Sequence, residues 1–316
     1  MSLTILANAG LATSGIDALT AGGHTVITTK VAQSQLIDYI NQHKVDAILV
    51  RSATTVRQDM IDACPSLKMV GRGGVGMDNI DVDYAKSKGL KVFNTPAASS
   101  DSVAELVFAH LFGMVRHLHD ANRNMPLDGD SQFGQLKKTY AKGSELSGKT
   151  IGIIGFGRIG KAVARRAYGV GMRVIVHDPH LLDGDFEVAF ADGQILKTSA
   201  SMLSMNEVLR AADVVTLHIG GNSELIDAKA LATMKEGAFL INAARGGVVN
   251  EPALIDALKS QHIKAAGLDV FVDEPKPSVQ ILMNPHVSLT PHIGAATVEA
   301  QARIGLELAE QIMAKS

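Results

Sequence analysis

The sequence predicts an α/β fold with two doubly wound parallel sheets, and three observations predict it. The chain has 316 residues, a length that suits two domains, each with its own buried core. Short aliphatic runs alternate with stretches of helical period along most of the chain, as they do where helices join parallel strands. Aromatic residues make up only 4% of the chain, so aliphatic side chains and 12 Met must fill the interior.

Five aliphatic runs in the first third of the chain predict the strands of one sheet. They span residues 4–7, 25–28, 47–50, 68–71 and 90–93, with helical period at residues 35–41 and 60–63 between them. A long helix is expected from Asp101 to about Asn122, because apolar residues recur there at helical spacing. Residues 124–148 carry Gly, Pro and charge without a clear period, and a loop region is expected there.

A second alternating series predicts the other sheet and a terminal helix. Its strands are expected at residues 150–154, 174–176, 214–217, 238–241, 265–268 and 287–289, and the helix from about Thr297 to Ala314. Both units are expected to be Rossmann or flavodoxin-like. Prolines at the two candidate hinges divide the chain into one lobe of residues 1–97 with 292–316 and another of residues 98–291. A cleft between the lobes is the expected ligand site.

Charge and cysteine content narrow the classes of partner. The 30 Lys and Arg against 32 Asp and Glu leave no basic excess for nucleic acid or an anionic membrane surface. Cys64 stands alone, so an intrachain disulfide is impossible, and we expect a structural thiol in a reducing compartment. No basic segment precedes the first apolar residues, and no apolar run approaches the ~18 residues of a membrane span. A cytoplasmic protein with no membrane partner is therefore expected.

A glycine fingerprint predicts a dinucleotide site in the second lobe. The spacing G-x-G-x-x-G occurs at Gly155, Gly157 and Gly160, after a predicted strand, and its residues Arg158 and Ile159 open a helix. Asp178 ends the next strand 18 positions after Gly160, where a carboxylate binds the ribose hydroxyls. The same carboxylate repels a 2′-phosphate, so NAD is favoured over NADP. The second lobe is thus the expected NAD-binding domain, and the first the substrate-binding domain.

The same glycine spacing also occurs in the first lobe, at Gly71, Gly73 and Gly76. Acidic residues follow this match closely, and they would repel a pyrophosphate. The next predicted strand ends in the neutral Asn94 at the interval where a ribose-binding carboxylate is needed. We therefore expect a turn on the substrate side here.

Three charged side chains follow predicted strands of the second series. A protein that transfers hydride to a carbonyl needs a proton donor, a group to orient that donor, and a cation to hold a carboxylate. Arg245 in Asn-Ala-Ala-Arg-Gly-Gly, Glu274 in Leu-Asp-Val-Phe-Val-Asp-Glu-Pro, and His292 in Thr-Pro-His-Ile-Gly-Ala supply such groups. Each residue by itself is equally compatible with a surface charge or a loop histidine.

Those three motifs, in that order after a dinucleotide fingerprint, resemble the D-2-hydroxyacid dehydrogenases over nearly the whole chain. The resemblance implies an NAD-dependent oxidoreductase in which Arg245 binds the substrate carboxylate and Glu274 with His292 forms the acid/base pair. It implies that Asp269 meets the nicotinamide amide. The other cofactor contacts implied are His218, Ala243, Ala244, Arg245, His292 and Gly294.

Within that family, the segments Val-Arg-Ser-Ala-Thr and Val-Gly-Arg-Gly-Gly-Val-Gly-Met-Asp-Asn-Ile-Asp resemble the phosphoglycerate dehydrogenases. This implies that Arg51 and Arg72 hold a substrate phosphate, with Lys138 completing the site across a homodimer interface. The turn amides of Gly73, Gly74 and Val75 would meet the carboxylate. The implied reaction is oxidation of D-3-phosphoglycerate to 3-phosphohydroxypyruvate, the first step of phosphorylated serine synthesis, in a short form without a C-terminal regulatory domain.

Two alternatives stay open at this point. A hydroxypyruvate or glyoxylate reductase of the same family would share the fold and the three catalytic candidates, although such relatives usually lack the paired arginines. A non-catalytic NAD-sensing protein could retain every motif, because a fold alone does not establish a function. A metal site is not expected, since His117 and His119 lie two apart on a predicted helix and point in different directions.

Overall fold

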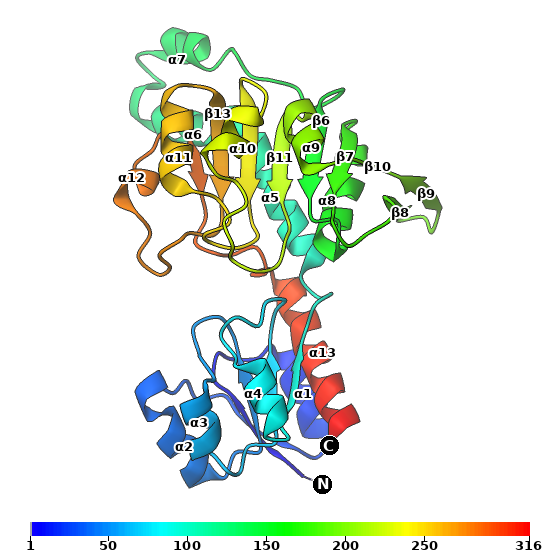
Figure 1. The fold of residues 1–316 in the computed structure, drawn as a ribbon. Helices are drawn as coiled ribbons and strands as arrows, with labels where there is room; N and C mark the ends of the chain where they lie inside the picture. The colour runs from blue at the N-terminus through cyan, green and yellow to red at the C-terminus, as the bar shows by residue number, and fades with distance from the viewer. Residues whose placement is uncertain (1) are drawn as a thin grey trace. The chain divides into compact units, whose positions relative to one another are not determined.

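The computed structural model describes residues 2–316, which pack into two compact units (Figure 1). Unit 1 comprises the residues up to Ser102 together with Ala295–Ser316, and unit 2 comprises Val103–Gly294. Each unit has its own parallel sheet with helices on both faces, which confirms the predicted fold class. None of the helices described in residues 2–316 is both long enough and apolar enough to cross a membrane.

The sheet of unit 1 has five parallel strands in the order β2-β1-β3-β4-β5. The aliphatic runs become strands because their side chains are buried between the two helical layers. The strands are β1 (Thr4–Ala7), β2 (Thr25–Ile27), β3 (Ala47–Val50), β4 (Met69–Arg72) and β5 (Lys91–Asn94). All five predicted strands are confirmed, with ends that differ by a residue or two.

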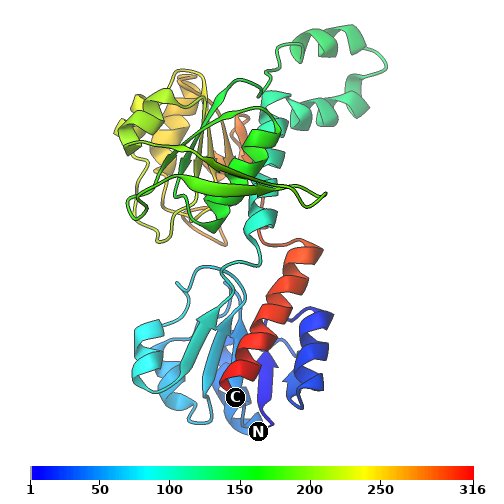
Figure 2. The same cartoon turned by 90° about the vertical axis from the view of Figure 1, so that its right-hand side faces the viewer.

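Helices from both ends of the chain cover one face of that sheet. Helix α1 (Thr13–Ala21) packs beside α13 (Val298–Lys315; Figure 2). Helix α13 begins where the Thr297 hydroxyl accepts a hydrogen bond from the Ala300 N–H (3.2 Å). Apolar side chains of α13 complete a core with β1, β3 and β4. The other face is covered by α2 (Leu36–His43), α3 (Gln58–Ala63) and α4 (Val82–Ser87), and the short 3-10 helix η1 (Gln33–Gln35) precedes α2.

The sheet of unit 2 has seven parallel strands in the order β10-β7-β6-β11-β12-β13-β14. The strands are β6 (Thr150–Ile154), β7 (Arg173–His177), β10 (Ser201–Met202), β11 (Val214–Leu217), β12 (Ala238–Asn242), β13 (Ile263–Leu268) and β14 (Val287–Leu289). One face packs on α5 (Ser100–Val115) and α8 (Arg158–Gly169). The other packs on α9 (Met205–Ala211), α10 (Ala228–Thr233), α11 (Glu251–Lys259) and α12 (Val279–Leu282). Every predicted strand of this series is present.

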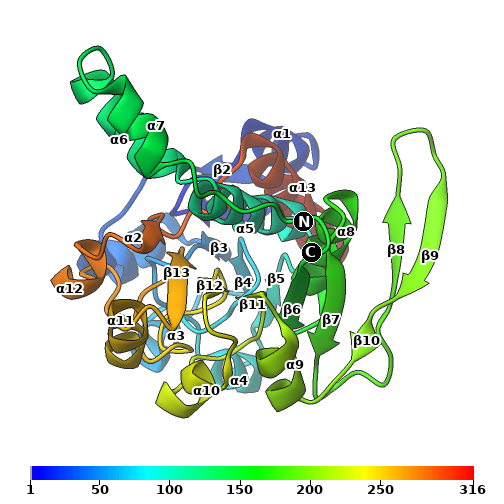
Figure 3. The same cartoon turned by 90° about the horizontal axis from the view of Figure 1, so that it is seen from above.

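The region after α5 corrects two expectations. The single helix expected from Asp101 to Asn122 is two helices, because His117 has a left-handed backbone (φ 53°) and α6 (Leu118–Asp128) begins after it. The loop expected at residues 124–148 contains the end of α6 and a further helix, α7 (Phe133–Thr139). These two helices pack on each other and contain no buried residue, so no core-facing period marks them in the sequence (Figure 3).

A two-stranded antiparallel hairpin of β8 (Asp185–Ala189) and β9 (Ile195–Ser199) was not expected from the sequence. It lies apart from the main sheet in Figure 3. Phe186 of β8 is buried and packs edge-on against Phe156 and Tyr168, with ring centroids 5.7 and 5.4 Å apart. This aromatic cluster attaches the hairpin to unit 2.

The crossing of α1 and α13 depends on two glycines and yields a stability prediction. A Cβ at Gly15 would lie 2.7 Å from the backbone of Gly305. We expect Gly15→Ala to lower the free energy of unfolding by about 1–3 kcal/mol, because the helices must move apart. Gly113→Ala in α5 is the control, since a Cβ there meets nothing within 4 Å. Urea unfolding midpoints measure both, and equal midpoints for the two variants would contradict the close contact.

Candidate functional site

The glycine fingerprint forms the turn between β6 and α8. Gly155 has a left-handed backbone (φ 90°), and a Cβ on it would lie 2.3 Å from the His218 carbonyl oxygen. A Cβ on Gly160 would lie 2.2 Å from the Gly155 carbonyl oxygen, so only glycine lets the helix approach the strand this closely. A Cβ on Gly157 would meet nothing within 4 Å. The chain is therefore tightly packed at two glycines and open at the third.

The surroundings of this turn fit a dinucleotide. Helix α8 begins at Arg158, with no acidic residue in its first turn, so the positive end of the helix is available to a pyrophosphate. Asp178 follows β7, and its carboxylate accepts hydrogen bonds from the N–H groups of Phe156 (2.8 Å) and His180 (2.9 Å). These contacts hold an acidic group beside the glycine turn. An open approach, a helix amino end and an anchored carboxylate are the features that a nucleotide diphosphate with a free ribose requires.

His218 follows β11 and contributes a buried neutral imidazole beside the same turn. Its Nε2 is hydrogen-bonded to the Thr216 hydroxyl (2.9 Å), whereas its Nδ1 is buried without a hydrogen-bond partner. Burial lowers the pKa of His218 to about 3, because water cannot solvate an imidazolium there. The ring is therefore uncharged at neutral pH.

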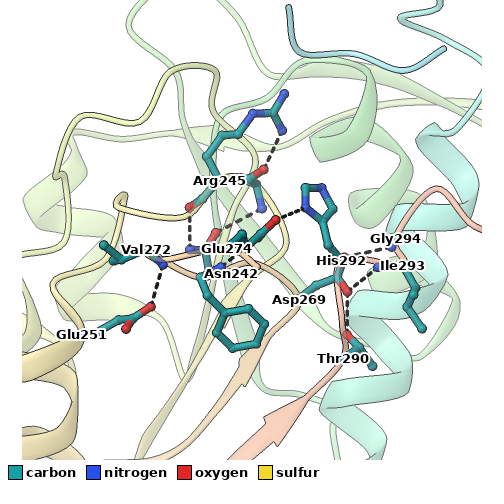
Figure 4. A network of polar contacts seen from close by, with 12 residues as sticks. Asn242, Arg245, Glu251, Asp269, Val272, Glu274, Thr290, His292, Ile293 and Gly294 are labelled. Carbon is teal, nitrogen blue, oxygen red and sulfur yellow. Dashed lines mark hydrogen bonds and ion pairs between the residues drawn. The ribbon is translucent and has the colours of Figure 1, made fainter. Parts of the chain in front are cut away.

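The end of β12 forms the turn that carries Arg245. The side chain of Asn242 donates to the Arg245 carbonyl oxygen (3.0 Å) and accepts from the Ala244 N–H (3.1 Å), which fixes the backbone of this turn and of Ala243. The Arg245 Nη1 donates to the Ala244 carbonyl oxygen (2.7 Å). A Cβ on Gly246 would lie 1.8 Å from the Phe271 carbonyl oxygen, so this turn packs directly on the loop after β13 (Figure 4).

His292 and Glu274 form a direct pair. The Nδ1 of His292 lies 2.8 Å from Oε2 of Glu274, and the other carboxylate oxygen accepts from the Phe271 N–H (3.1 Å). Each side chain is about one third exposed, at 37% and 35%. Buried Glu251 fixes the same loop from its other side by accepting from the Val272 N–H (2.9 Å; Figure 4).

A pocket of about 390 Å³ opens beside this pair within unit 2. Its lining is mostly apolar, and the imidazole and the carboxylate are its ionisable groups. The lining residues are Phe271, Glu274, Pro275, Pro277, Leu282, Leu289, Thr290, Pro291 and His292.

Asp269 is a buried carboxylate, only 2% exposed, below the loop that carries His292. One oxygen accepts from the Thr290 hydroxyl (2.7 Å) and from the Ile293 N–H (2.8 Å). The other accepts from the Gly294 N–H (2.8 Å). A carboxylate can accept about four hydrogen bonds, so one further donor can still be bound. These contacts bind the Thr290 side chain before His292 and the backbone N–H groups directly after it, and the φ of His292 is 55° (Figure 4).

The structure thus brings Arg245, Glu274 and His292 to one edge of the unit 2 sheet. They follow β12, β13 and β14, which are neighbours in the sheet and parallel. Asn242 and Glu251 were missed by the sequence reasoning. The signal for Asn242 was its place at the end of a strand. A side-chain amide there can form hydrogen bonds with backbone groups of the following turn, which no longer pair with a neighbouring strand.

The substrate candidates of unit 1 also lie at a carboxyl edge. Arg72 ends β4 in register with Val50, and Arg51 follows directly after β3. The Arg51 Nη2 donates to the Gln301 amide oxygen, and burial lowers the pKa of Arg51. In the part of the chain that the structure describes, Arg51 forms no ion pair with a carboxylate.

The turn after β4 makes room for the Arg72 guanidinium. A Cβ on Gly74 would overlap Arg72 Nη1, at a distance of 1.6 Å. Gly73 precedes this position and donates its N–H to the Val50 carbonyl oxygen (2.9 Å), and Val75 is exposed. Lys138 lies exposed on α7 of unit 2, so its place in a phosphate site stays a prediction.

Comparison with known proteins gives one family. Residues 108–294 match the family model described as "D-isomer specific 2-hydroxyacid dehydrogenase, NAD binding domain". A hydroxypyruvate reductase of Thermotoga maritima is 41% identical over 275 residues, which cover 85% of this chain and 84% of that protein. A D-3-phosphoglycerate dehydrogenase of Bacillus subtilis is 38% identical over 288 residues, covering 90% of this chain and 52% of that protein. The chain thus spans about half the length of that dehydrogenase.

The solved structures include similar folds. A glyoxylate reductase from Paecilomyes thermophila superimposes with a TM-score of 0.82 at 30% identity. The match covers 98% of this chain and 94% of that one, so both units have counterparts in it.

The lowered pKa of His218 leads to a prediction of how the free energy of unfolding depends on pH. Its folded pKa of about 3 lies below the ordinary value of 6.5, so below pH 6.5 the unfolded chain binds a proton that the folded chain does not. The contribution of the neutral His218 ring to the free energy of unfolding is therefore complete above pH 6.5. As the pH is lowered from 6.5 to 3, this contribution should fall by about 1.4 kcal/mol per pH unit. Urea unfolding of wild type and His218→Gln at several pH values measures this. The wild-type slope should exceed that of the variant, and His180→Gln, at an exposed position, should keep the wild-type slope.

Proposed function

The chain belongs to the D-isomer specific 2-hydroxyacid dehydrogenase family, and on that premise we propose that it oxidises D-3-phosphoglycerate to 3-phosphohydroxypyruvate with NAD. This reaction would open the phosphorylated route to serine. The observation that carries the chemistry is the 2.8 Å contact of His292 with Glu274, beside the turn of Arg245. A histidine paired with a carboxylate beside a guanidinium is what removal of a proton from a 2-hydroxy acid requires.

The proposed reaction gives each proton a direction. Ionised Glu274 accepts only, so neutral His292 donates from Nδ1 and keeps a lone pair on Nε2. Nε2 then takes the substrate hydroxyl proton, and Glu274 stabilises the imidazolium that forms. Arg245 binds the substrate carboxylate through its planar guanidinium. Bound NAD supplies the acceptor for the hydride that leaves the substrate carbon.

Residues of unit 2 would hold the cofactor at both ends. The pyrophosphate would lie over Gly157 at the amino end of α8, where a Cβ would find open space. Asp178 would bind the adenosine ribose and repel a 2′-phosphate, which favours NAD over NADP. The unused acceptor capacity of Asp269 would bind the nicotinamide amide.

Two features of unit 1 support a phosphorylated substrate. The half-buried Arg51 has a neutral amide as its side-chain partner, so its charge is available to an anionic ligand. Arg72 lies at the same sheet edge, and a dianionic phosphate suits two guanidinium groups. Lys138 and a homodimer interface stay predictions.

Hydroxypyruvate reduction is the second candidate, and one observation favours it. The hydroxypyruvate reductase of Thermotoga maritima matches this chain over most of its own length, whereas the phosphoglycerate dehydrogenase of Bacillus subtilis matches over about half. An NADH-absorbance assay with 3-phosphohydroxypyruvate, hydroxypyruvate, glyoxylate, pyruvate and 2-oxoglutarate separates the candidates. A chain that binds NADH and oxidises it with none of these acids would be an NAD-sensing protein.

Replacing the proposed acid/base should separate chemistry from cofactor binding. We expect His292→Gln to lower kcat by roughly 10²- to 10⁴-fold, because the amide cannot take up the hydroxyl proton. The dissociation constant for NADH, measured by fluorescence titration, should stay within about threefold, since the turn at Gly157 and the Asp178 carboxylate are unchanged. Turnover close to that of wild type would remove His292 from this role.

The phosphate assignment predicts substrate-dependent effects. Arg51→Ala and Arg72→Ala should each raise KM for 3-phosphohydroxypyruvate about tenfold or more, and change KM for hydroxypyruvate little, because only the first carries a phosphate. Arg57→Ala is the matched control, since Arg57 also belongs to unit 1 but is exposed and paired with Asp81. Equal effects on both substrates would exclude a phosphate-specific role for the two arginines.

A further inference from the structure

His110 is a buried polar side chain that the proposed reaction does not use. It lies on an otherwise apolar stretch of α5, and its side chain is only 4% exposed. A Cβ on Gly267 of β13 would lie 2.9 Å from the His110 Cβ, so the glycine makes room for the imidazole against the sheet. A buried imidazole is costly unless both ring nitrogens are hydrogen-bonded.

Both nitrogens of His110 have partners in the segment that leads to His292, formed by β14 and the residue after it. Nδ1 lies 2.8 Å from the Ser288 hydroxyl of β14, and Nε2 lies 3.0 Å from the Thr290 hydroxyl that follows it. The Thr290 hydroxyl in turn lies 2.7 Å from Asp269. A continuous chain of hydrogen bonds therefore joins α5 to the carboxylate below the His292 loop.

The chemistry of the groups fixes the proton on every link. Asp269 as a carboxylate only accepts, so the Thr290 hydroxyl must give it its proton. The Thr290 oxygen then accepts from His110, which places the imidazole proton on Nε2. The unprotonated Nδ1 accepts from the Ser288 hydroxyl. Burial lowers the pKa of His110, although the Asp269 charge acts in the opposite direction, and the neutral ring satisfies every bond in the chain.

We propose that His110 is a positioning residue for the acid/base loop: its Nε2–H commits the Thr290 hydroxyl to Asp269, and Asp269 binds the Thr290 side chain before His292 and two backbone N–H groups after it. The proposal deepens the proposed function and rests on it for its effect on turnover. Without the His110 donor, the Thr290 hydroxyl can turn toward the ring site, and Asp269 then loses one of its three bonds. The Ile293 and Gly294 N–H groups that share this carboxylate would be held less firmly.

The first test does not depend on activity. In wild-type protein labelled with ¹⁵N at histidine, the His110 ring should show a protonated Nε2 and an unprotonated Nδ1 in long-range ¹H–¹⁵N spectra at pH 7. The opposite tautomer would overturn the proposal, because Thr290 could then not receive a proton from His110 while donating to Asp269. This result holds whichever substrate the protein uses.

A pair of buried amides supplies matched variants. In His110→Gln the amide nitrogen can reach the position of Nε2 and donate to Thr290, whereas in His110→Asn the shorter side chain reaches only the position of Nδ1 near Ser288. Amide hydrogen exchange at Ile293 and Gly294 should be close to wild type in His110→Gln and at least about tenfold faster in His110→Asn and in Thr290→Val. Equal exchange in the two His110 variants would contradict the proposal.

Turnover gives the second readout. With 3-phosphohydroxypyruvate or hydroxypyruvate as substrate, kcat should fall about 10- to 100-fold in His110→Asn, with KM within about threefold, and be largely restored in His110→Gln. Thermal unfolding of both variants checks that they are folded. If wild-type protein turns over neither acid, the proposed function fails while the spectra and exchange rates still decide the role of His110. A loss of kcat that is equal in both variants would assign His110 a packing role only.

Discussion

The arrangement of the site depends on the hydrogen bonds to the buried carboxylate of Asp269. Its backbone N–H bonds to the Asn242 carbonyl oxygen at the end of β12, and its side chain binds the segment that follows β14. One residue thus links three neighbouring strand ends. Because a carboxylate in a low-dielectric interior must be satisfied by donors, every group around it is oriented toward it. The unusual backbone of His292 is held by this requirement.

The parallel sheet explains why groups far apart along the chain meet. Every strand of the seven-stranded sheet ends at the same edge, and the loops after β12, β13 and β14 are neighbours because their strands are. Arg245, Glu274 and His292 each lie on one of these loops. Two of these loops also contact each other directly, since the Phe271 carbonyl oxygen leaves no room for a side chain at Gly246. The geometry of the candidate site therefore depends on strand order more than on any single loop.

The sequence predicted what depends on burial and repeated pattern. The strands were found because fully buried strands are aliphatic throughout, and the glycine turn because only glycine fits at Gly155 and Gly160. Helices α6 and α7 were not predicted as separate helices because they bury no side chain. The β8–β9 hairpin was not predicted because Phe186 is its only buried residue among those described. His110 carried no signal in the sequence, since its partners, Ser288 on β14 and Thr290 directly after it, lie 178 and 180 residues away.

The contribution of α13 to unit 1 affects the order in which the chain can fold as it leaves the ribosome. Unit 1 takes its first residues up to Ser102 and its last from Ala295 onward, with all of unit 2 between them. At roughly 5–20 residues per second, translation of the intervening segment lasts on the order of 10–40 s. Throughout that interval the apolar face of β1, β3 and β4 lacks α13, one of the two helices that cover it. The nascent polypeptide therefore exposes apolar surface during this interval, which favours aggregation until α13 has been made.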